Sequence, residues 1–156
     1  MDIADLIDPQ RIRCGVEGSS KKRSLEDLAR LLATVAPDLT AEEIFESLIG
    51  RERLGSTGLG HGVALPHGRL AGLRRPVAAV MTLDRGIDFD AADRQPVDLL
   101  FALLVPADAA QEHLEILARL ARMFDDPHFR EQLRGCHDPV EAARQFQLWQ
   151  PRRDTA

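Results

Sequence analysis

Aromatic residues are scarce in this sequence, which has six phenylalanines, one tryptophan and no tyrosine among 156 residues. A platform of stacked rings for nucleic-acid bases is therefore not expected. Basic residues are not in excess either, because 20 lysines and arginines face 25 acidic residues and leave a formal net charge of −5. Such a chain lacks the basic surface with which proteins bind phosphate backbones or anionic membranes. We predict that it has no nucleic-acid partner.

Long apolar runs are also missing. No stretch of 18 apolar residues occurs, and the start MDIADLIDPQ lacks the basic-then-apolar pattern of a signal peptide. The two cysteines, Cys14 and Cys136, form neither a disulfide framework nor a metal pair. We therefore expect no membrane insertion, reduced thiols and a cytoplasmic protein. The hydrophobic fraction of 44% fits one globular domain over residues 1–156, with its core at about 10–148.

Periodicity and capping residues divide the chain into helices and strands. A first helix is predicted at about 21–35 and a second from the capping box of Thr40 and Glu43 to about Arg53. Apolar runs predict strands at 12–16, 63–65, 77–83 and 97–105, and three further helices should follow caps at Asp108, Asp126 and Asp138. Residues 1–9 and 151–156 are expected to be loosely held ends. This order predicts an α/β domain with helices on a central sheet.

Two of the five histidines follow predicted strands in similar contexts. His67 comes directly after the run that Pro66 closes, and Gly68 would leave room for a group to approach its ring. His113 lies early in the helix that follows 97–105, a helix whose core stripe is predicted at Leu114, Leu117, Ala118, Ala121 and Phe124. Parallel strands would bring both imidazoles to one edge, where α/β proteins bind ligands. Alternatively, each histidine merely covers the edge of the sheet.

A glycine-rich stretch, Gly55-Ser-Thr-Gly-Leu-Gly-His-Gly62, has the composition of an anion cradle. Its backbone N–H groups and the hydroxyls of Ser56 and Thr57, with Gly58 and Gly60, could surround a phosphate. It lacks the Gly-Lys-Ser/Thr of a Walker loop and the strand and helix of a dinucleotide fingerprint, so we predict no cofactor. The alternative is an ordinary tight connection.

Three other features have a structural and a functional interpretation. Arg51, at the end of the second helix, is either a solvated residue or a bidentate phosphate clamp. The basic run 21–23 is either a solvated face or a docking patch for an acidic protein. A metal site would combine His61, His67 and His113, but their spacing matches no common zinc pattern, and we predict no metal.

A longer motif connects these residues to a known family. The segment Arg51-Glu-Arg-Leu-Gly-Ser-Thr-Gly-Leu-Gly-His-Gly-Val-Ala-Leu-Pro-His67-Gly resembles the active-site region of the IIA components of the bacterial phosphotransferase system, in the mannitol/fructose class and its nitrogen-regulatory branch. Residues 95–108 resemble a second block of that family, and residues 20–25 resemble the nitrogen-regulatory branch. The resemblance covers about residues 10–148 and implies a mannitol-type IIA fold with a central mixed sheet.

The resemblance also implies roles for individual residues. His67 would be the histidine that is transiently phosphorylated, Arg51 the arginine near the phosphoryl group, and His113 the second histidine of the site. His61 departs from the pattern, because relatives of this branch usually carry asparagine there. A third imidazole near the site would either perturb its pKa or contact a partner.

The implied function is that of a phosphocarrier with a transient phosphohistidine rather than an enzyme that turns over small molecules. The implied donor is a histidine phosphocarrier protein, and the implied regulatory targets are proteins such as kinases and potassium transport systems. The sequence has no fused IIB or IIC portion, which favours the regulatory branch. Two alternatives stay open: a sugar-specific IIA that passes phosphate to a IIB component, and a non-covalent module that binds an anion or nucleotide.

Overall fold

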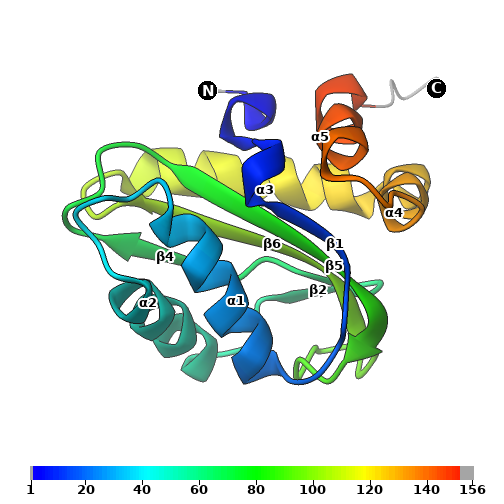
Figure 1. Ribbon diagram of the computed structural model, residues 1–156, viewed down its shortest axis with the longest axis horizontal. Helices are drawn as coiled ribbons and strands as arrows, with labels where there is room; N and C mark the ends of the chain where they lie inside the picture. Colours follow the sequence, from blue (N-terminus) through cyan, green and yellow to red (C-terminus); the bar gives the residue numbers. More distant parts are fainter. Residues whose placement is uncertain (1, 152–156) are drawn as a thin grey trace.

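The computed structural model describes residues 2–151 as five α-helices, six strands and two short 3-10 helices (Figure 1). The helices are α1 (Lys21–Ala33), α2 (Ala41–Arg53), α3 (Ala110–Asp125), α4 (Pro127–Arg134) and α5 (Pro139–Leu148). The strands are β1 (Ile12–Val16), β2 (Gly58–Gly60), β3 (Val63–Ala64), β4 (His67–Leu70), β5 (Val77–Ile87) and β6 (Val97–Pro106). The 3-10 helices are η1 (Ile3–Leu6) and η2 (Pro9–Arg11). Apart from Pro151, the predicted frayed tail lies outside the described residues.

The strands form one mixed sheet in the order β1-β5-β6-β3-β2, with β4 paired to β6 beyond β3. The two long strands, β5 and β6, are antiparallel, whereas β1 runs parallel to β5 and both β3 and β4 run parallel to β6. Strand β2 is antiparallel to β3. The central mixed sheet that the family resemblance implies is thus confirmed.

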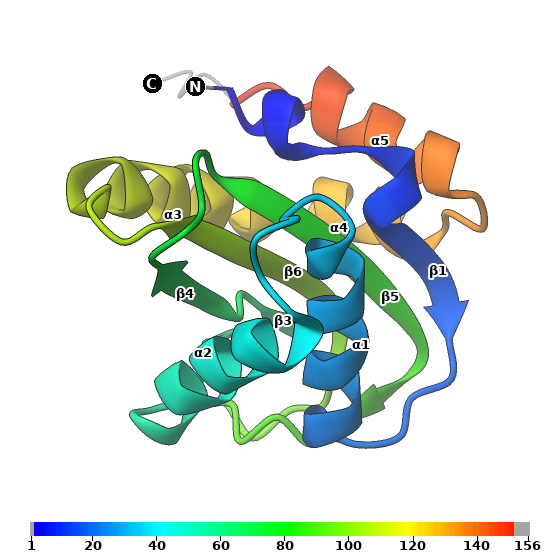
Figure 2. The ribbon, with the colours of Figure 1, turned by 60° about the vertical axis from the view of Figure 1, so that its left-hand side comes forward.

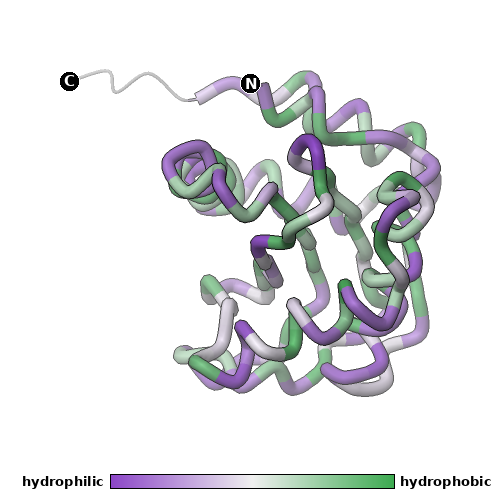
Figure 3. Tube along the Cα trace, turned by 90° about the vertical axis from the view of Figure 1, so that its left-hand side faces the viewer, coloured by the Kyte–Doolittle hydropathy of each residue, from purple (hydrophilic) through white to green (hydrophobic). Residues whose placement is uncertain are grey.

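Helices cover both faces of this sheet, which is buried between them (Figures 1 and 2). Helices α1 and α2 pack on one face, and α3, α4 and α5 pack on the other. A hydrophobic core lies on each face of the sheet, because successive residues of a strand point to opposite faces. In β6, Phe101 and Leu103 face α3, whereas Leu100 and Leu104 face α1 and α2. Hydrophilic and hydrophobic residues alternate along the helices around this interior (Figure 3).

Side-chain caps start four of the five helices where the sequence predicts them. Ser20 caps α1, and Asp126 and Asp138 cap α4 and α5 ahead of a proline. Thr40 and Glu43 form the predicted capping box of α2. Each cap supplies an acceptor to a backbone N–H that the first turn leaves unpaired, which is a local interaction that neighbouring residues specify.

The predicted start of α3 is wrong, and its predicted core stripe is right only in part. Its N-cap is Ala109, which has no side-chain cap, because Asp108 lies in the turn between Pro106 and Ala109. Phe124 is buried as predicted and Leu117 packs against the core, but Leu114 is 63% exposed, Ala118 is exposed and Ala121 is half-buried. The other buried residues of the stripe are Ile116, Leu120 and Met123. The apolar residues of this helix occur on more than one face, so spacing alone does not select the face that packs on the sheet.

The N-terminal segment is not loosely held. Ile3 and Leu6 are 4% and 2% exposed and belong to the core beneath α3 and α5. The sequence also gave no signal for β2 and β4, because both strands contain glycine and neither has an apolar run. Both are held in the sheet by their neighbours rather than by local β-propensity.

Candidate functional site

The sequence predicts that His67 follows a strand that Pro66 closes. Strand β3 does end before Pro66, but His67 is the first residue of a further strand, β4. Strands β3 and β4 run along the same side of β6, and Leu65 and Pro66 interrupt them. The carbonyl of Pro66 accepts from the N–H of Leu103 at 2.9 Å, so the interruption keeps its bond to β6. His67 pairs with Leu103, and Leu103 belongs to the core under α3. Paired residues of neighbouring strands share a face, so the His67 side chain lies on the α3 side of the sheet.

The room that Gly68 provides lies against helix α2 and not beside the imidazole ring, where the sequence predicts it. The next residue of a strand points to the opposite face, and Gly68 faces helix α2. A Cβ atom at Gly68 would lie 2.3 Å from Oγ of Ser47. The glycine therefore allows α2 to pack closely on β4, which holds the C-terminal end of α2 near His67.

The structure brings His67 and His113 together. Their ring centroids are 5.1 Å apart and their planes meet at 68°, an edge-to-face arrangement. His113 lies in the first turns of α3, which follows β6 and folds back over the sheet. The two imidazoles are thus neighbours because α3 covers the face to which His67 points.

One ring nitrogen of His67 is hydrogen-bonded to the backbone. Its Nδ1 lies 2.7 Å from the carbonyl oxygen of Leu65, which is only an acceptor, so Nδ1 carries the proton. In the neutral ring the lone pair is then on Nε2. Burial lowers the pKa of His67, the Leu65 bond raises it, and the Arg51 charge lowers it. The ring is therefore neutral near pH 7, with a free nucleophilic nitrogen.

His113 is also neutral at that pH. Burial, followed by the nearby charges of His67, Arg69 and Arg51, lowers its pKa from the ordinary value to about 4. Its Nε2 is the one buried side-chain nitrogen or oxygen in residues 2–151 that has no hydrogen-bond partner. A buried polar atom without a partner is costly. Its position beside His67 makes it available to an anionic group bound there.

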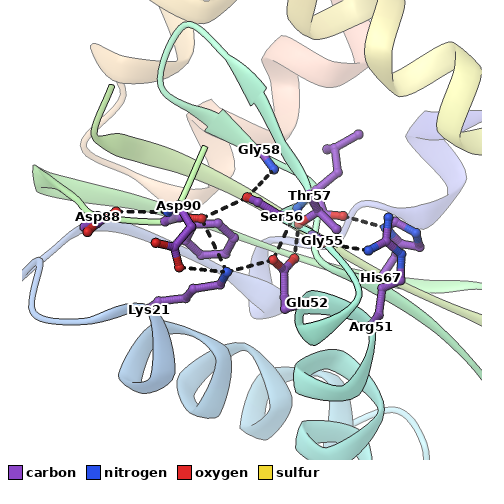
Figure 4. Close-up of polar contacts among 12 residues, drawn as sticks. Lys21, Arg51, Glu52, Gly55, Ser56, Thr57, Gly58, His67, Asp88 and Asp90 are labelled. Carbon is purple, nitrogen blue, oxygen red and sulfur yellow. Dashed lines mark hydrogen bonds and ion pairs between the residues drawn. The ribbon is translucent and has the colours of Figure 1, made fainter. Parts of the chain in front are cut away.

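Two arginines place positive charge at this pair of rings. Arg51, at the end of α2, donates from Nη1 to the carbonyl of Gly55 at 2.8 Å, and Figure 4 shows it beside His67. Arg69 lies on β4 two residues after His67, hence on the same face of the sheet. Arg69 is not among the residues predicted from the sequence, although its i+2 spacing from His67 in a strand was the available signal.

The expected phosphate cradle is only partly compatible with the contacts. The Ser56 hydroxyl donates to the carbonyl of Phe89 and accepts from the N–H of Gly58. Thr57 is buried, and both its N–H and its hydroxyl donate to Glu52. The interpretation of these two hydroxyls as phosphate ligands is therefore wrong for this conformation, because their protons have partners inside the protein.

The rest of the glycine-rich stretch leads away from His67. In the β2–β3 hairpin, Gly58 is opposite Ala64 and Gly60 is opposite Val63, so each step moves further from residue 67. His61 lies at the exposed turn with φ 56°, a left-handed conformation in which asparagine, aspartate and histidine are all several-fold enriched.

His61 is not near the other two histidines. It lines a small hollow with residues 121–125 of α3, and residue 121 is about 12 Å along the helix axis from His113 at 1.5 Å per residue. A third imidazole at the site, and a metal site that combines His61 with His67 and His113, are both excluded by this separation. In the described part of the chain, no group of three or more His, Cys, Asp or Glu residues is arranged to hold a metal ion.

A groove of about 1090 Å³ between α1 and α2 is lined by neither His67 nor His113. Among residues 2–151, no helix has both the length and the apolar character needed to cross a membrane. The histidine site itself consists of a half-buried imidazole with an unprotonated ring nitrogen and adjacent positive charge. That arrangement suits the transfer of an anionic group from another macromolecule.

Comparisons with known proteins agree with this description. Residues 5–147 match the family described as "Phosphoenolpyruvate-dependent sugar phosphotransferase system, EIIA 2". A "Nitrogen regulatory protein" of Pseudomonas aeruginosa is 50% identical over 133 residues, which are 85% of this chain and 86% of that protein. The crystal structure of nitrogen regulatory protein IIA-Ntr from Neisseria meningitidis superposes with a TM-score of 0.88 at 40% identity, covering 92% of this chain and 98% of that one.

A more distant structure supports the fold alone. The crystal structure of IIA mannitol from Escherichia coli has a TM-score of 0.75 at 18% identity, with 90% of this chain and 98% of that chain covered. The mannitol-type IIA fold that the sequence resemblance implies is therefore confirmed.

Proposed function

The chain belongs to the EIIA 2 family of the phosphoenolpyruvate-dependent sugar phosphotransferase system, and on this premise we propose that it is a phosphocarrier whose acceptor atom is Nε2 of His67. The observation that carries the proposal is the tautomer of His67. The Leu65 carbonyl holds the proton on Nδ1, so the lone pair is on the other nitrogen. The unpartnered Nε2 of His113 lies on the neighbouring ring.

The proposed reaction moves one phosphoryl group between two imidazoles. The donor is a histidine phosphocarrier protein. Its N–P bond breaks as the lone pair of His67 Nε2 forms a new N–P bond, and the donor nitrogen recovers its own lone pair. No proton has to leave Nε2, because that nitrogen carries none. The ring of His67 gains positive charge in the product, and its Nδ1–H shares this charge with the Leu65 carbonyl.

Neighbouring groups stabilise the phosphoryl oxygens. Phosphoryl transfer needs alignment and charge stabilisation more than covalent help from the protein. Arg51 and Arg69 supply positive charge, and the neutral imidazole of His113 can donate one hydrogen bond. The backbone of residues 58–61 takes no part in this assignment, since its hairpin leads away from His67.

The proposed output is regulatory. Phosphorylation adds roughly −1.5 to −2 charge at one surface position, if phosphohistidine behaves like other phosphorylated side chains. Such a change opens or blocks a docking surface for a target protein, for which kinases and potassium transport systems are the proposed classes. The name "Nitrogen regulatory protein" of a relative at 50% identity supports this role over sugar transport.

A labelling experiment tests the proposal. The purified protein is incubated with phosphoenolpyruvate and the donor relay, and the modified residue is mapped. We expect the label on His67, lost in acid and kept in base as for a phosphoramidate, and absent from His67→Ala. His128→Ala, which replaces an exposed histidine on α4, is the matched control and should be labelled normally.

Two results would overturn the assignment: phosphate mapped to Ser56 or Thr57, or normal labelling of His67→Ala. The regulatory role has a separate test in the same preparation. Rapid passage of the label to a purified IIB component would favour a sugar-specific IIA, whereas retention of the label, together with a target that binds only one phosphorylation state, supports regulation.

A further inference from the structure

Glu52 directly follows Arg51 in α2, but its side chain points into the protein. The side chain is only 2% exposed, and a buried carboxylate is costly unless it is paired and hydrogen-bonded. It receives three partners: Nζ of Lys21 at 3.0 Å, the N–H of Thr57 at 3.2 Å and the Thr57 hydroxyl. Figure 4 shows Glu52 between Lys21 and Thr57, with Arg51 and His67 beyond them.

Lys21 has several contacts besides its ion pair with Glu52. Its Nζ donates to the Phe89 carbonyl at 3.3 Å, lies 4.7 Å from the centre of the Phe89 ring and is 3.8 Å from Asp90. The basic run that starts at Lys21 is therefore not uniformly a solvated face. The side chain of Lys21 is 18% exposed, whereas that of Arg23 is 64% exposed.

Backbone hydrogen bonds continue this chain of contacts to the nucleophile. The carbonyl of Thr57 accepts from the N–H of Leu65 at 3.1 Å. The carbonyl of Leu65 accepts from Nδ1–H of His67 at 2.7 Å. Thr57 is thus fixed by Glu52 on one side and fixes Leu65 on the other. The N–H and the carbonyl of one residue belong to different peptide groups, so this series acts by holding the backbone at residues 57 and 65 in place.

We propose that Glu52 is a positioning residue for His67, acting through Thr57 and Leu65. Its carboxylate holds Thr57, whose carbonyl accepts from the N–H of Leu65 and so holds the backbone at that residue. The Leu65 carbonyl, oriented in this way, keeps the proton on Nδ1 of His67. The inference deepens the proposed function, because this proton position leaves Nε2 free to accept a phosphoryl group. Lys21 supplies the counter-charge that allows a carboxylate to occupy this buried place.

The negative charge of Glu52 also favours the phosphorylated form of His67. Burial lowers the pKa of His67 most, and the Glu52 charge is one of the groups that raise it again. When the ring accepts a phosphoryl group it gains positive charge, which a negative group at the far end of the hydrogen-bonded series stabilises. Partners that orient a histidine by its second nitrogen typically contribute roughly 10- to 100-fold to its function at metal sites.

The test uses conservative replacements in the full-length protein. Glu52→Gln keeps the size of the side chain and removes its charge. Thr57→Val removes the hydroxyl bond at nearly constant shape, and Thr57→Ser restores the hydroxyl. Glu46→Gln, an exposed change on the same helix, is the matched control. The readouts are the ¹⁵N chemical shifts of the His67 ring, which report tautomer and pKa, and the rate of labelling by the donor.

We expect Glu52→Gln and Thr57→Val to lower the pKa of His67, to increase the share of the other tautomer and to slow labelling by about tenfold. Thr57→Ser and Glu46→Gln should resemble the wild type. Unchanged ring shifts in folded Thr57→Val protein would overturn the proposal, even if Glu52→Gln fails to fold. The ring shifts need no phosphate, so they decide this inference separately from whether His67 is the phosphoryl acceptor.

Discussion

The rings of His67 and His113 meet edge to face at 68°, with 5.1 Å between their centroids. One ring comes from an interrupted strand beside β6 and the other from the helix that follows β6. Because the rings are adjacent and half-buried, a positive charge on either one disfavours protonation of the other. Both are therefore neutral near pH 7, where the first is proposed to act as a nucleophile.

The protonation of His113 gives a direct prediction. Burial, followed by the charges of His67, Arg69 and Arg51, lowers its pKa to about 4. An NMR titration of the histidine rings, assigned with His113→Ala, should find this imidazole neutral down to nearly that pH. A value close to 6.5, the ordinary pKa of histidine, would show that the ring is solvated and separate from His67.

The same shift makes stability depend on pH. The pKa of His113 is about 6.5 in the unfolded chain and about 4 in the folded chain, so this residue costs no stability above pH 6.5. Below that pH the unfolded chain binds a proton that the folded chain does not, and the free energy of unfolding falls as the pH drops toward 4. His113→Ala should lose less stability over that range than the wild type. Urea unfolding of both proteins at pH 7.5 and 4.5 measures the difference.

Removal of His113 should slow phosphoryl transfer without preventing folding. The core stripe of α3 lies at Ile116, Leu120 and Phe124, so it survives the change, and alanine is the better helix former. The free energy of unfolding at pH 7 should change by no more than about 1 kcal/mol. Unchanged labelling kinetics in His113→Ala would mean that this ring only covers the sheet.

Arg51→Ala should slow labelling of His67 by roughly 10- to 100-fold but not abolish it. Loss of one group that stabilises transition-state charge commonly costs such a factor or more, while the nucleophile and Arg69 are still present. Arg53→Ala is the control, because Arg53 is exposed at the same end of α2. Equal effects of the two substitutions would indicate a general contribution of charge rather than a contact at the site.

Gly68→Ala should destabilise the protein by about 1–2 kcal/mol, because the new methyl group would meet Oγ of Ser47 at 2.3 Å. Ser47→Ala should remove most of this cost in the double variant, since the obstructing atom is the end of a short side chain. Urea unfolding of both single variants and the double variant measures the coupling. Additive effects would show that Gly68 is needed for a reason other than the approach of α2.

Local signals in the sequence determined a large part of this molecule. The caps at Ser20 and Thr40 and the prolines after Asp126 and Asp138 place four helix starts, because a cap is satisfied by residues within one turn. Continuous apolar runs identify β5 and β6, because strands covered on both faces have no polar side. The motif around His67 was sufficient to indicate the family.

Only the tertiary structure decided which groups meet. The partner of Nδ1 of His67, the distance of His61 from the site and the packing reason for Gly68 all depend on how β3, β4 and α2 lie against one another. The buried carboxylate of Glu52 looks in the sequence like any charged residue at a helix end. Periodicity and capping specify elements over a few residues, whereas face, register and burial arise from contacts between segments that are distant in the chain.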